Sequence, residues 1–194
     1  MERALEDRAV DYEVSPGEGA FYGPKIDFHI TDCLGRTWQC GTIQADFSMP
    51  ERFDLEYTDR DGRRKRPVTI HRTVLGSLER FLGLLIEHYA GALPFWLAPV
   101  QAVVVPVTDE ILDYAREVHK KIREAAFRVD LDDRSETVAN KIRQAEVLKI
   151  PYMLVVGKRE AAEGTVSVRE HSKGDTGPAP LPEVLAKFSS LRGD

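Results

Sequence analysis

The chain has 194 residues, of which 42% are hydrophobic and 30% charged, and its formal net charge is −5. This composition is typical of a globular protein of one large or two small domains, and the negative charge argues against a protein that grips nucleic acid through bulk positive charge. The chain has no run of about 18 apolar residues, no signal-peptide core and only two cysteines, so we expect no membrane span and a reducing, cytoplasmic location.

The first predicted elements are a short helix and a strand with two chemically different faces. Residues 1–8 are good helix formers without a clear cap. In residues 25–31 apolar and polar side chains alternate, which predicts a half-buried strand. Residues 32–36 hold the Asp and the Gly that reversing turns favour. We therefore expect an antiparallel pair of strands near the N-terminus.

The second strand of that pair, residues 37–47, contains Gly41, and a glycine inside a strand often marks a bulge. A bulge of one residue would bring four polar side chains to the same face of the strand. These side chains are Gln39, Thr42, Gln44 and Asp46. Four polar groups on one face predict a wet, concave surface and not a packed core.

Residues 53–58 and 67–75 predict a hairpin, joined by a tip at 59–66 that contains an Asp-Gly turn and a run of basic residues. The basic tip either touches a nucleic-acid backbone or is simply solvated, and the sequence leaves both interpretations open. In residues 77–89 the apolar side chains recur at helical spacing, which predicts an amphipathic helix.

A connector punctuated by prolines, residues 93–99, is the best candidate for a domain boundary, which we place between residues 1–95 and 96–194. Beyond it, buried strands alternate with helices, as in a compact α/β sandwich. The predicted strands span residues 100–107, 128–131, 152–156 and 165–170, and the predicted helices span 109–126, 136–150 and 182–191. Residues 174–182 are predicted to form a loop. The predicted fold class is therefore α/β with an α+β first half, and the second half is expected to hold a mixed, mostly parallel sheet with one antiparallel addition.

Arg80 stands at the predicted junction of a strand and a helix. An arginine at such a junction can hold a nucleotide phosphate with two hydrogen bonds, and its guanidinium can stack on adenine. The alternative is a surface ion pair with Glu79 or Glu87, on a sheet face that merely faces water. Periodicity alone favours this second interpretation.

His71 lies among polar positions of its strand and is a candidate metal ligand. The only tempting partners are His29, Cys33 and Cys40, and their spacings match no zinc pattern. The residues therefore argue against a zinc site wholly within this chain, and they favour both cysteines as small buried side chains.

Charged residues follow two predicted strands of the second half. Because parallel strands gather ligand-binding loops at their carboxyl ends, we expect Arg134, Ser135, Lys158 and Glu160 near one rim. Arginines that read bases, with a carboxylate that accepts a base amino group, would suit recognition of single-stranded RNA. Ordinary charge decoration of a globular domain explains the same residues equally well.

Three long segments, in this order and spacing, resemble the last part of the catalytic domain of threonyl-tRNA synthetases. They are residues 19–28 (Gly-Ala-Phe-Tyr-Gly-Pro-Lys-Ile-Asp-Phe), 38–47 (Trp-Gln-Cys-Gly-Thr-Ile-Gln-Ala-Asp-Phe) and 70–81 (Ile-His-Arg-Thr-Val-Leu-Gly-Ser-Leu-Glu-Arg-Phe). The Glu-Arg pair of the third segment resembles motif 3 of class II synthetases. The residues after the connector resemble the anticodon-binding domain of that family, so the resemblance spans essentially the whole chain. It implies an antiparallel class II sheet fragment in the first half and a mixed, mostly parallel five-stranded sheet in the second.

The resemblance implies an adenylation site in the first half. Arg80 and Lys25 would be catalytic residues, Arg80 as the motif 3 arginine that contacts ATP and Lys25 beside the activated carboxyl group. Tyr22 and Gln44 would line the threonine pocket. The residues near ATP or the adenylate would be Gln39, Thr42, Ser77 and Arg80.

The resemblance also implies a metal and an RNA partner. His71 matches the histidine ligand of the family's zinc ion, which holds threonine through its amino and hydroxyl groups, and Mg²⁺ would accompany ATP. The anticodon-binding positions in the second half would be Arg143, Glu160, Arg169, Ser135 and Lys149. Ser135 and Lys149 differ in residue type from the forms associated with the family.

The function implied is that of a threonine–tRNA ligase, which activates threonine with ATP and transfers it to tRNA(Thr), as a homodimer in the full-length family. In the family the other zinc ligands and motifs 1 and 2 lie upstream. We therefore expect that this chain alone neither binds zinc tightly nor makes threonyl-adenylate. In this interpretation Tyr22, Gln44, His71 and Arg80 share one pocket.

Two other functions remain open at this stage. One is a non-catalytic, synthetase-like module that recognises tRNA through its C-terminal domain. The other is an orphan fragment that self-associates through exposed apolar surface.

Overall fold

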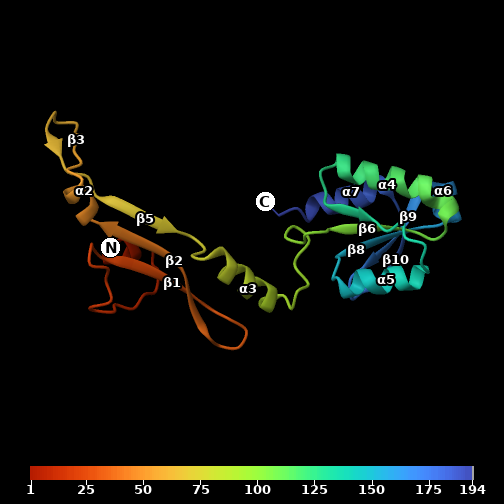
Figure 1. The fold of residues 1–194 in the computed structure, drawn as a ribbon, viewed down its shortest axis with the longest axis horizontal. Coiled ribbons are helices and arrows are strands. Elements are labelled where there is room, and N and C mark those ends of the chain that lie inside the picture. The colour runs from red at the N-terminus through yellow and green to blue at the C-terminus, as the bar shows by residue number, and fades with distance from the viewer. Residues whose placement is uncertain (194) are drawn as a thin grey trace. The chain divides into compact units, whose positions relative to one another are not determined.

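The computed structural model describes residues 1–193, which divide into two compact units after residue 88 (Figure 1). The predicted domain boundary at 95/96 falls inside the second unit, because Phe95 is buried there and packs against Phe127 and Phe188. Within the described residues, no helix combines the length and the apolar character that crossing a membrane requires.

The first unit is built on a three-stranded antiparallel sheet in the order β1-β2-β5. The strands are β1 (Lys25–Thr31), β2 (Thr37–Asp46) and β5 (Thr69–Thr73), and a short helix α1 (Glu2–Glu6) precedes them. The first helix, the first strand and the turn into the second strand are thus confirmed.

The predicted bulge is present in β2. Phe28 lies opposite Gly41 and His29 lies opposite Gln39, so Cys40 is the extra residue of the bulged strand. Adding a Cβ at Gly41 would bring it within 2.9 Å of the Val74 carbonyl oxygen, which explains why this position requires glycine.

The predicted hairpin of residues 53–58 and 67–75 is wrong. Residues 48–52 form a short helix, α2 (Ser48–Arg52), and only two-residue strands, β3 (Tyr57–Thr58) and β4 (Arg64–Lys65), pair around the basic tip. The segment from Thr69 onward pairs with β2 instead. Alternation along a strand defines its two faces but not its neighbour, and here the neighbour is set by long-range pairing.

The first unit leaves much of its apolar surface exposed. Helix α3 (Leu78–His88) was predicted correctly, yet its apolar residues Leu78, Leu82 and Ile86 are 47–67% exposed. Ile70 on β5 is 58% exposed. Because little of its apolar surface is buried, this unit has a small core of its own.

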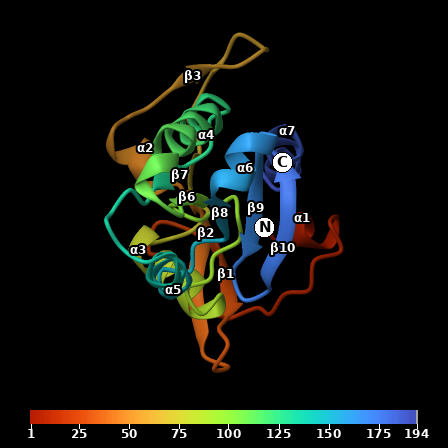
Figure 2. The same ribbon diagram turned by 90° about the vertical axis from the view of Figure 1, so that its right-hand side faces the viewer.

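The second unit contains a five-stranded sheet in the order β10-β9-β8-β6-β7 (Figures 1 and 2). Its strands are β6 (Ala102–Pro106), β7 (Val129–Leu131), β8 (Tyr152–Val156), β9 (Thr165–Glu170) and β10 (Gly174–Pro180). Strand β6 is parallel to both β7 and β8, whereas β9 and β10 continue the sheet antiparallel.

The predicted loop at residues 174–182 is wrong, because most of it is strand β10. Its glycines and prolines are typical of loops, but an edge strand tolerates both, since one side of its backbone needs no partner. The ladder is irregular between Asp175 and Gly177, as in a bulge.

Helices cover both faces of this sheet, as Figures 1 and 2 show. Helices α4 (Leu112–Glu124) and α7 (Leu181–Ser190) lie on one face, and α5 (Val138–Val147) lies on the other. A 3₁₀ turn, η1 (Asp109–Ile111), precedes α4. A short helix, α6 (Lys158–Glu163), was not predicted. Alternate residues of β6 point to the two cores, Val104 towards α4 and Val105 towards α5.

Glu170, at the end of β9, accepts hydrogen bonds from Lys173 and Lys187. These donors outweigh burial and lower the pKa of Glu170 below its ordinary value. A depressed folded-state pKa means that the stabilisation is complete above the unfolded pKa of about 4.3 and is lost as the pH falls through the folded value.

We therefore predict that Glu170→Gln lowers the free energy of unfolding by roughly 1 kcal/mol at pH 7, since both lysines are partly solvated. The difference from wild type is expected to be smaller at pH 3, which lies below the unfolded pKa of about 4.3. Urea unfolding of both proteins at the two pH values measures it, with the exposed Glu117→Gln as control. An equal difference at both pH values would contradict this account of Glu170.

Candidate functional site

The polar face of the first sheet is organised in rows that cross all three strands. In one row, Gln44 of β2 lies between Lys25 of β1 and His71 of β5. In the next row, Thr42 lies between Asp27 and Thr73. Residues directly opposite each other in a pleated sheet share a face, so three strands present one continuous polar surface.

Tyr22, Gln44 and His71 come together at one end of this surface. The Tyr22 hydroxyl donates to Gln44 Oε1 at 2.5 Å, and the Tyr22 and His71 rings meet edge-on with centroids 6.1 Å apart. All three line a cavity of about 370 Å³ together with Asp46 and Arg52. The cavity is large enough for a small polar molecule such as an amino acid.

Asp46 lines that cavity and is held in place by several hydrogen bonds. It is 1% exposed, and its Oδ1 accepts the backbone amides of Ser48 and Met49 at 2.9 Å, which joins the end of β2 to the first turn of α2. Its Oδ2 lies 2.9 Å from His71 Nε2. The Met49 amide, followed by His71 and Ser48, lowers the pKa of Asp46 despite its burial. Sequence analysis placed Asp46 on the polar face but missed this anchoring role, although an Asp just before a helix start is a recognisable capping signal.

A carboxylate behind an imidazole is the arrangement that orients metal-bound histidines. His71 has this support, but the described residues contain no group of three His, Cys, Asp or Glu side chains that could hold a metal ion. Cys40 is buried and Cys33 is exposed, so the prediction of two buried cysteines is half right. The donor set of residues 1–193 therefore does not form a zinc site by itself.

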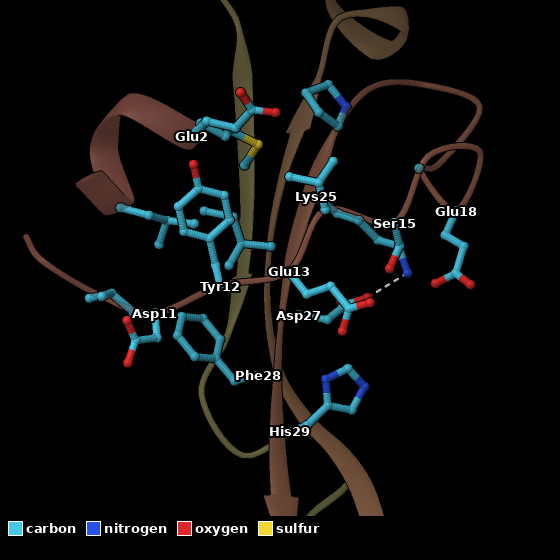
Figure 3. Close-up of a pocket in the computed structure, with 17 residues that line it drawn as sticks. Glu2, Asp11, Tyr12, Glu13, Ser15, Glu18, Lys25, Asp27, Phe28 and His29 are labelled. Carbon is cyan, nitrogen blue, oxygen red and sulfur yellow. Dashed lines mark hydrogen bonds and ion pairs between the residues drawn. The ribbon is translucent and has the colours of Figure 1, made fainter. Parts of the chain in front are cut away.

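Lys25 lies at the edge of the polar face and pairs with Asp27, Nζ to Oδ2, at 2.5 Å. Burial tends to raise the pKa of Asp27, but Lys25 and Thr42 outweigh it and the pKa is lowered. Figure 3 shows this pair on the wall of a second cavity, of about 640 Å³, between β1 and the segment that holds Tyr12 and Glu13. The predicted threonine-pocket residues do not line this larger cavity.

Arg80 lies in the first turn of α3, by the Gln39 end of β2. Its Nη1 donates to the Gln39 carbonyl oxygen at 3.2 Å, and its guanidinium lies 5.9 Å from the centroid of the Trp38 ring. The alternative ion pairs of Arg80 are not formed in the described chain, because Glu87 pairs with Arg36 and Glu79 accepts from Ser77.

Arg80 does not line the cavity of Tyr22, Gln44 and His71. It lies beside Gln39, whereas that cavity lies at the Gln44 end of β2. The structure thus brings the predicted residues to one sheet but not into one enclosed pocket. Tyr22, Gln44 and His71 line one cavity, and Arg80 lies by the opposite end of β2.

In the second unit, two of the predicted RNA-binding residues lie at the carboxyl ends of the parallel strands. Ser135 is exposed in the loop that follows β7. Glu160 lies in the first turn of α6, directly after β8, and its Oε2 accepts the Gly157 amide at 2.9 Å. Nearby Lys158 pairs with Glu110 at 2.6 Å.

Arg169 and Arg143 belong to the α5 face of the sheet. Arg169 pairs in register with Met153, which belongs to the core beneath α5. Its Nη1 reaches Asp175 Oδ2 at 3.5 Å, while its buried Nε has no hydrogen-bond partner within the described chain. Arg143 is an exposed residue of α5 itself.

Lys149 lies apart from these residues. It follows the C-terminus of α5 in a left-handed conformation (φ +56°), and its aliphatic stem packs over Gly91. Because α5 connects two parallel strands, it runs from the carboxyl edge of the sheet back to the amino edge. Lys149 and Ser135 therefore lie at opposite ends of the helix.

Comparison with known families divides the chain in the same way as the structure. Residues 3–89 match the family described as tRNA synthetase class II core domain (G, H, P, S and T). Residues 101–191 match the family described as anticodon binding domain. The solved RNA binding domain of threonyl-tRNA synthetase from Cryptosporidium parvum is 41% identical with a TM-score of 0.88, covering 98% of this chain and 48% of that one.

Relatives that align with nearly the whole chain are also threonine–tRNA ligases. The chain is 58% identical over 185 residues to a threonine–tRNA ligase of Desulforamulus reducens and 55% identical over 188 residues to one of Carboxydothermus hydrogenoformans. These alignments cover 95% and 97% of the chain, but only 29% and 30% of the relatives. The chain therefore spans less than a third of the length of the ligases it matches.

Proposed function

We propose, from the premise that this chain belongs to the threonyl-tRNA synthetase family, that it serves in the ATP-dependent attachment of threonine to tRNA(Thr). Residues of the first unit would form one wall of the adenylation site, and the second unit would read the anticodon. The observation that carries the proposal is the polar row of Lys25, Gln44 and His71 beside the Tyr22 hydroxyl.

The cavity lined by Tyr22 and Gln44 would take the threonine side chain. A phenol and an amide that pair a substrate hydroxyl reject an analogue without that hydroxyl, because their own polar groups are then left unpaired. His71, oriented by Asp46, would supply one ligand to a zinc ion completed by residues outside this chain. That ion would bind the amino and hydroxyl groups of threonine.

ATP would lie along the Gln39 end of the polar face, with its Mg²⁺, near Gln39, Thr42, Ser77 and Arg80. In the activation step the threonine carboxylate oxygen bonds to the α-phosphorus while the bond to pyrophosphate breaks. Arg80 would stabilise the negative charge that develops on the phosphoryl oxygens, and Lys25 would lie beside the carboxyl group.

The second unit would bind the anticodon through Arg143, Glu160, Arg169, Ser135 and Lys149. Guanidinium groups and carboxylates suit the edges of unstacked bases, which is how single-stranded RNA is read. Ser135 and Glu160 lie at one edge of the sheet, and Arg143 and Arg169 lie on its α5 face. These positions support an RNA-binding role for the four residues more directly than the position of Lys149 does. Homodimer formation, expected from the family resemblance, remains a prediction.

Binding to an anticodon stem-loop tests this proposal. We predict that the chain binds a stem-loop with a threonine anticodon roughly tenfold or more tightly than one with that anticodon scrambled, since one good bidentate base contact is worth about 1–3 kcal/mol. Arg169→Ala is expected to remove most of this preference. The exposed Arg123→Ala, on α4, is the matched control.

Fluorescence anisotropy at a stated salt concentration measures both affinities. Equal affinities of the wild-type chain for the two stem-loops would contradict anticodon reading. A preference that survives Arg169→Ala would instead contradict the role of this arginine.

A further inference from the structure

Lys141 is a buried charged residue that the proposed function does not use. It lies on α5 and is 4% exposed. Its Nζ donates to the carbonyl oxygens of Pro106 at 3.3 Å and Asp132 at 3.0 Å. Burying an ammonium costs free energy unless hydrogen bonds compensate it, and here two carbonyl oxygens accept those bonds.

Within the described residues the Asp132 carbonyl oxygen accepts no backbone amide, for an identifiable reason. The β6–β7 ladder ends with the Asp132 amide donating to Val104 O at 2.9 Å. In a parallel ladder the next bond would run from the amide of residue 106 to the oxygen of Asp132. Residue 106 is proline and has no N–H, so the ladder stops there. Lys141 supplies the donor that Pro106 lacks.

The Lys141 ammonium therefore lies where β6 and β7 part and where the next loop begins. That loop, residues 132–137, contains Ser135 and leads into α5. Its Asp132 carboxylate holds the Arg134 guanidinium at 2.5 and 2.8 Å, and Arg134 reaches Gln144 of α5 at 2.5 Å. The Arg134 side chain, with a smaller contribution from Lys141, lowers the pKa of Asp132.

We propose that Lys141 is a positioning residue for RNA recognition by this unit. It fixes the 132–137 loop and the start of α5 against the carboxyl edge of the sheet, so that Ser135 and Arg143 are held in register. The inference rests on the proposed function. Because Lys141 is buried, it holds these residues without touching the RNA phosphates.

Lys141→Met tests the proposal, since it removes the ammonium and keeps the length of the side chain. The preference for the threonine anticodon over the scrambled one is expected to fall about tenfold, to near equality. Affinity for the scrambled stem-loop and its salt dependence are expected to stay unchanged, because no phosphate contact is lost. Lys120→Met, an exposed lysine of α4, is the control and should change nothing.

A second variant tests the backbone argument. Adding Pro106→Ala to Lys141→Met restores an N–H that can donate to the Asp132 carbonyl oxygen, so the double variant should regain part of the lost preference. If Lys141→Met alone does not fold, the anticodon preference is measured on the double variant. Hydrogen exchange of the 132–137 amides is expected to be faster in Lys141→Met and slower again in the double variant.

The outcomes distinguish failure of the proposed function from failure of the role of Lys141. A wild-type chain without anticodon preference would overturn the proposed function and, with it, this inference. A discriminating wild type together with an equally discriminating Lys141→Met would overturn the role of Lys141 alone. A reduced salt slope in Lys141→Met would also overturn it, because that result requires direct contact with phosphate.

Discussion

Replacing Phe188 by alanine is expected to lower the free energy of unfolding of the second unit by about 3–5 kcal/mol. The Phe188 side chain is fully buried, and its ring lies 4.8 Å from Phe95, 4.9 Å from Tyr152 and 5.6 Å from Phe127, centroid to centroid. Truncation would leave a cavity among three aromatic rings that cannot collapse to fill it.

Urea unfolding followed by hydrogen exchange of β6 and β8 peptides measures this loss, since both strands belong to the second unit. Leu148→Ala is the control, because Leu148 is 72% exposed and its truncation should change stability by less than about 0.5 kcal/mol. A Phe188→Ala protein within 1 kcal/mol of wild type would show that the aromatic cluster is not the centre of this core.

The second large effect concerns catalysis and requires the rest of a synthetase. If this chain replaces the aligned segment of the Desulforamulus reducens ligase, the chimera is expected to catalyse threonine-dependent exchange of pyrophosphate into ATP. Arg80→Ala should lower that rate by about 10²–10³-fold, the typical cost of removing one donor from a developing charge. Arg80→Lys should recover only part of it, because an ammonium lacks the fork of a guanidinium.

Arg63→Ala, at the exposed hairpin tip, is the matched control for the chimera and should leave the rate within about twofold. The isolated chain is expected to show no exchange activity. A folded but inactive chimera would favour the alternative of a non-catalytic RNA-binding module. An active chimera that tolerates Arg80→Ala would refute the role of Arg80 only.

Several parts of the fold could be predicted because they depend on neighbours in sequence. Alternation in residues 25–31 predicted β1 to the residue, and helical spacing predicted α3. Gly41 predicted the bulge, because a glycine inside a strand often marks one. Local backbone preference and side-chain period agree at these positions, so tertiary contacts had nothing to override.

The prediction failed where a residue's role depends on a distant partner. Thr69–Thr73 pairs with β2, across more than twenty residues of sequence, instead of with the nearby segment of Tyr57. Strand β10 forms because β9 offers it an edge, despite the glycines and prolines of a loop. Short helices such as α6 are too brief to show a period.

The candidate sites also combine features that follow from local sequence with features that depend on tertiary contacts. The amino-acid sequence alone determined which residue types share the polar face and which family the chain resembles, since both follow from local order. Only the tertiary structure decided that His71 rests on Asp46 and that Arg80 lies outside the cavity of Tyr22. It also decided that Lys141 is buried while Lys149 covers Gly91. Each of these depends on contacts between residues far apart in the sequence, and no local pattern carries that information.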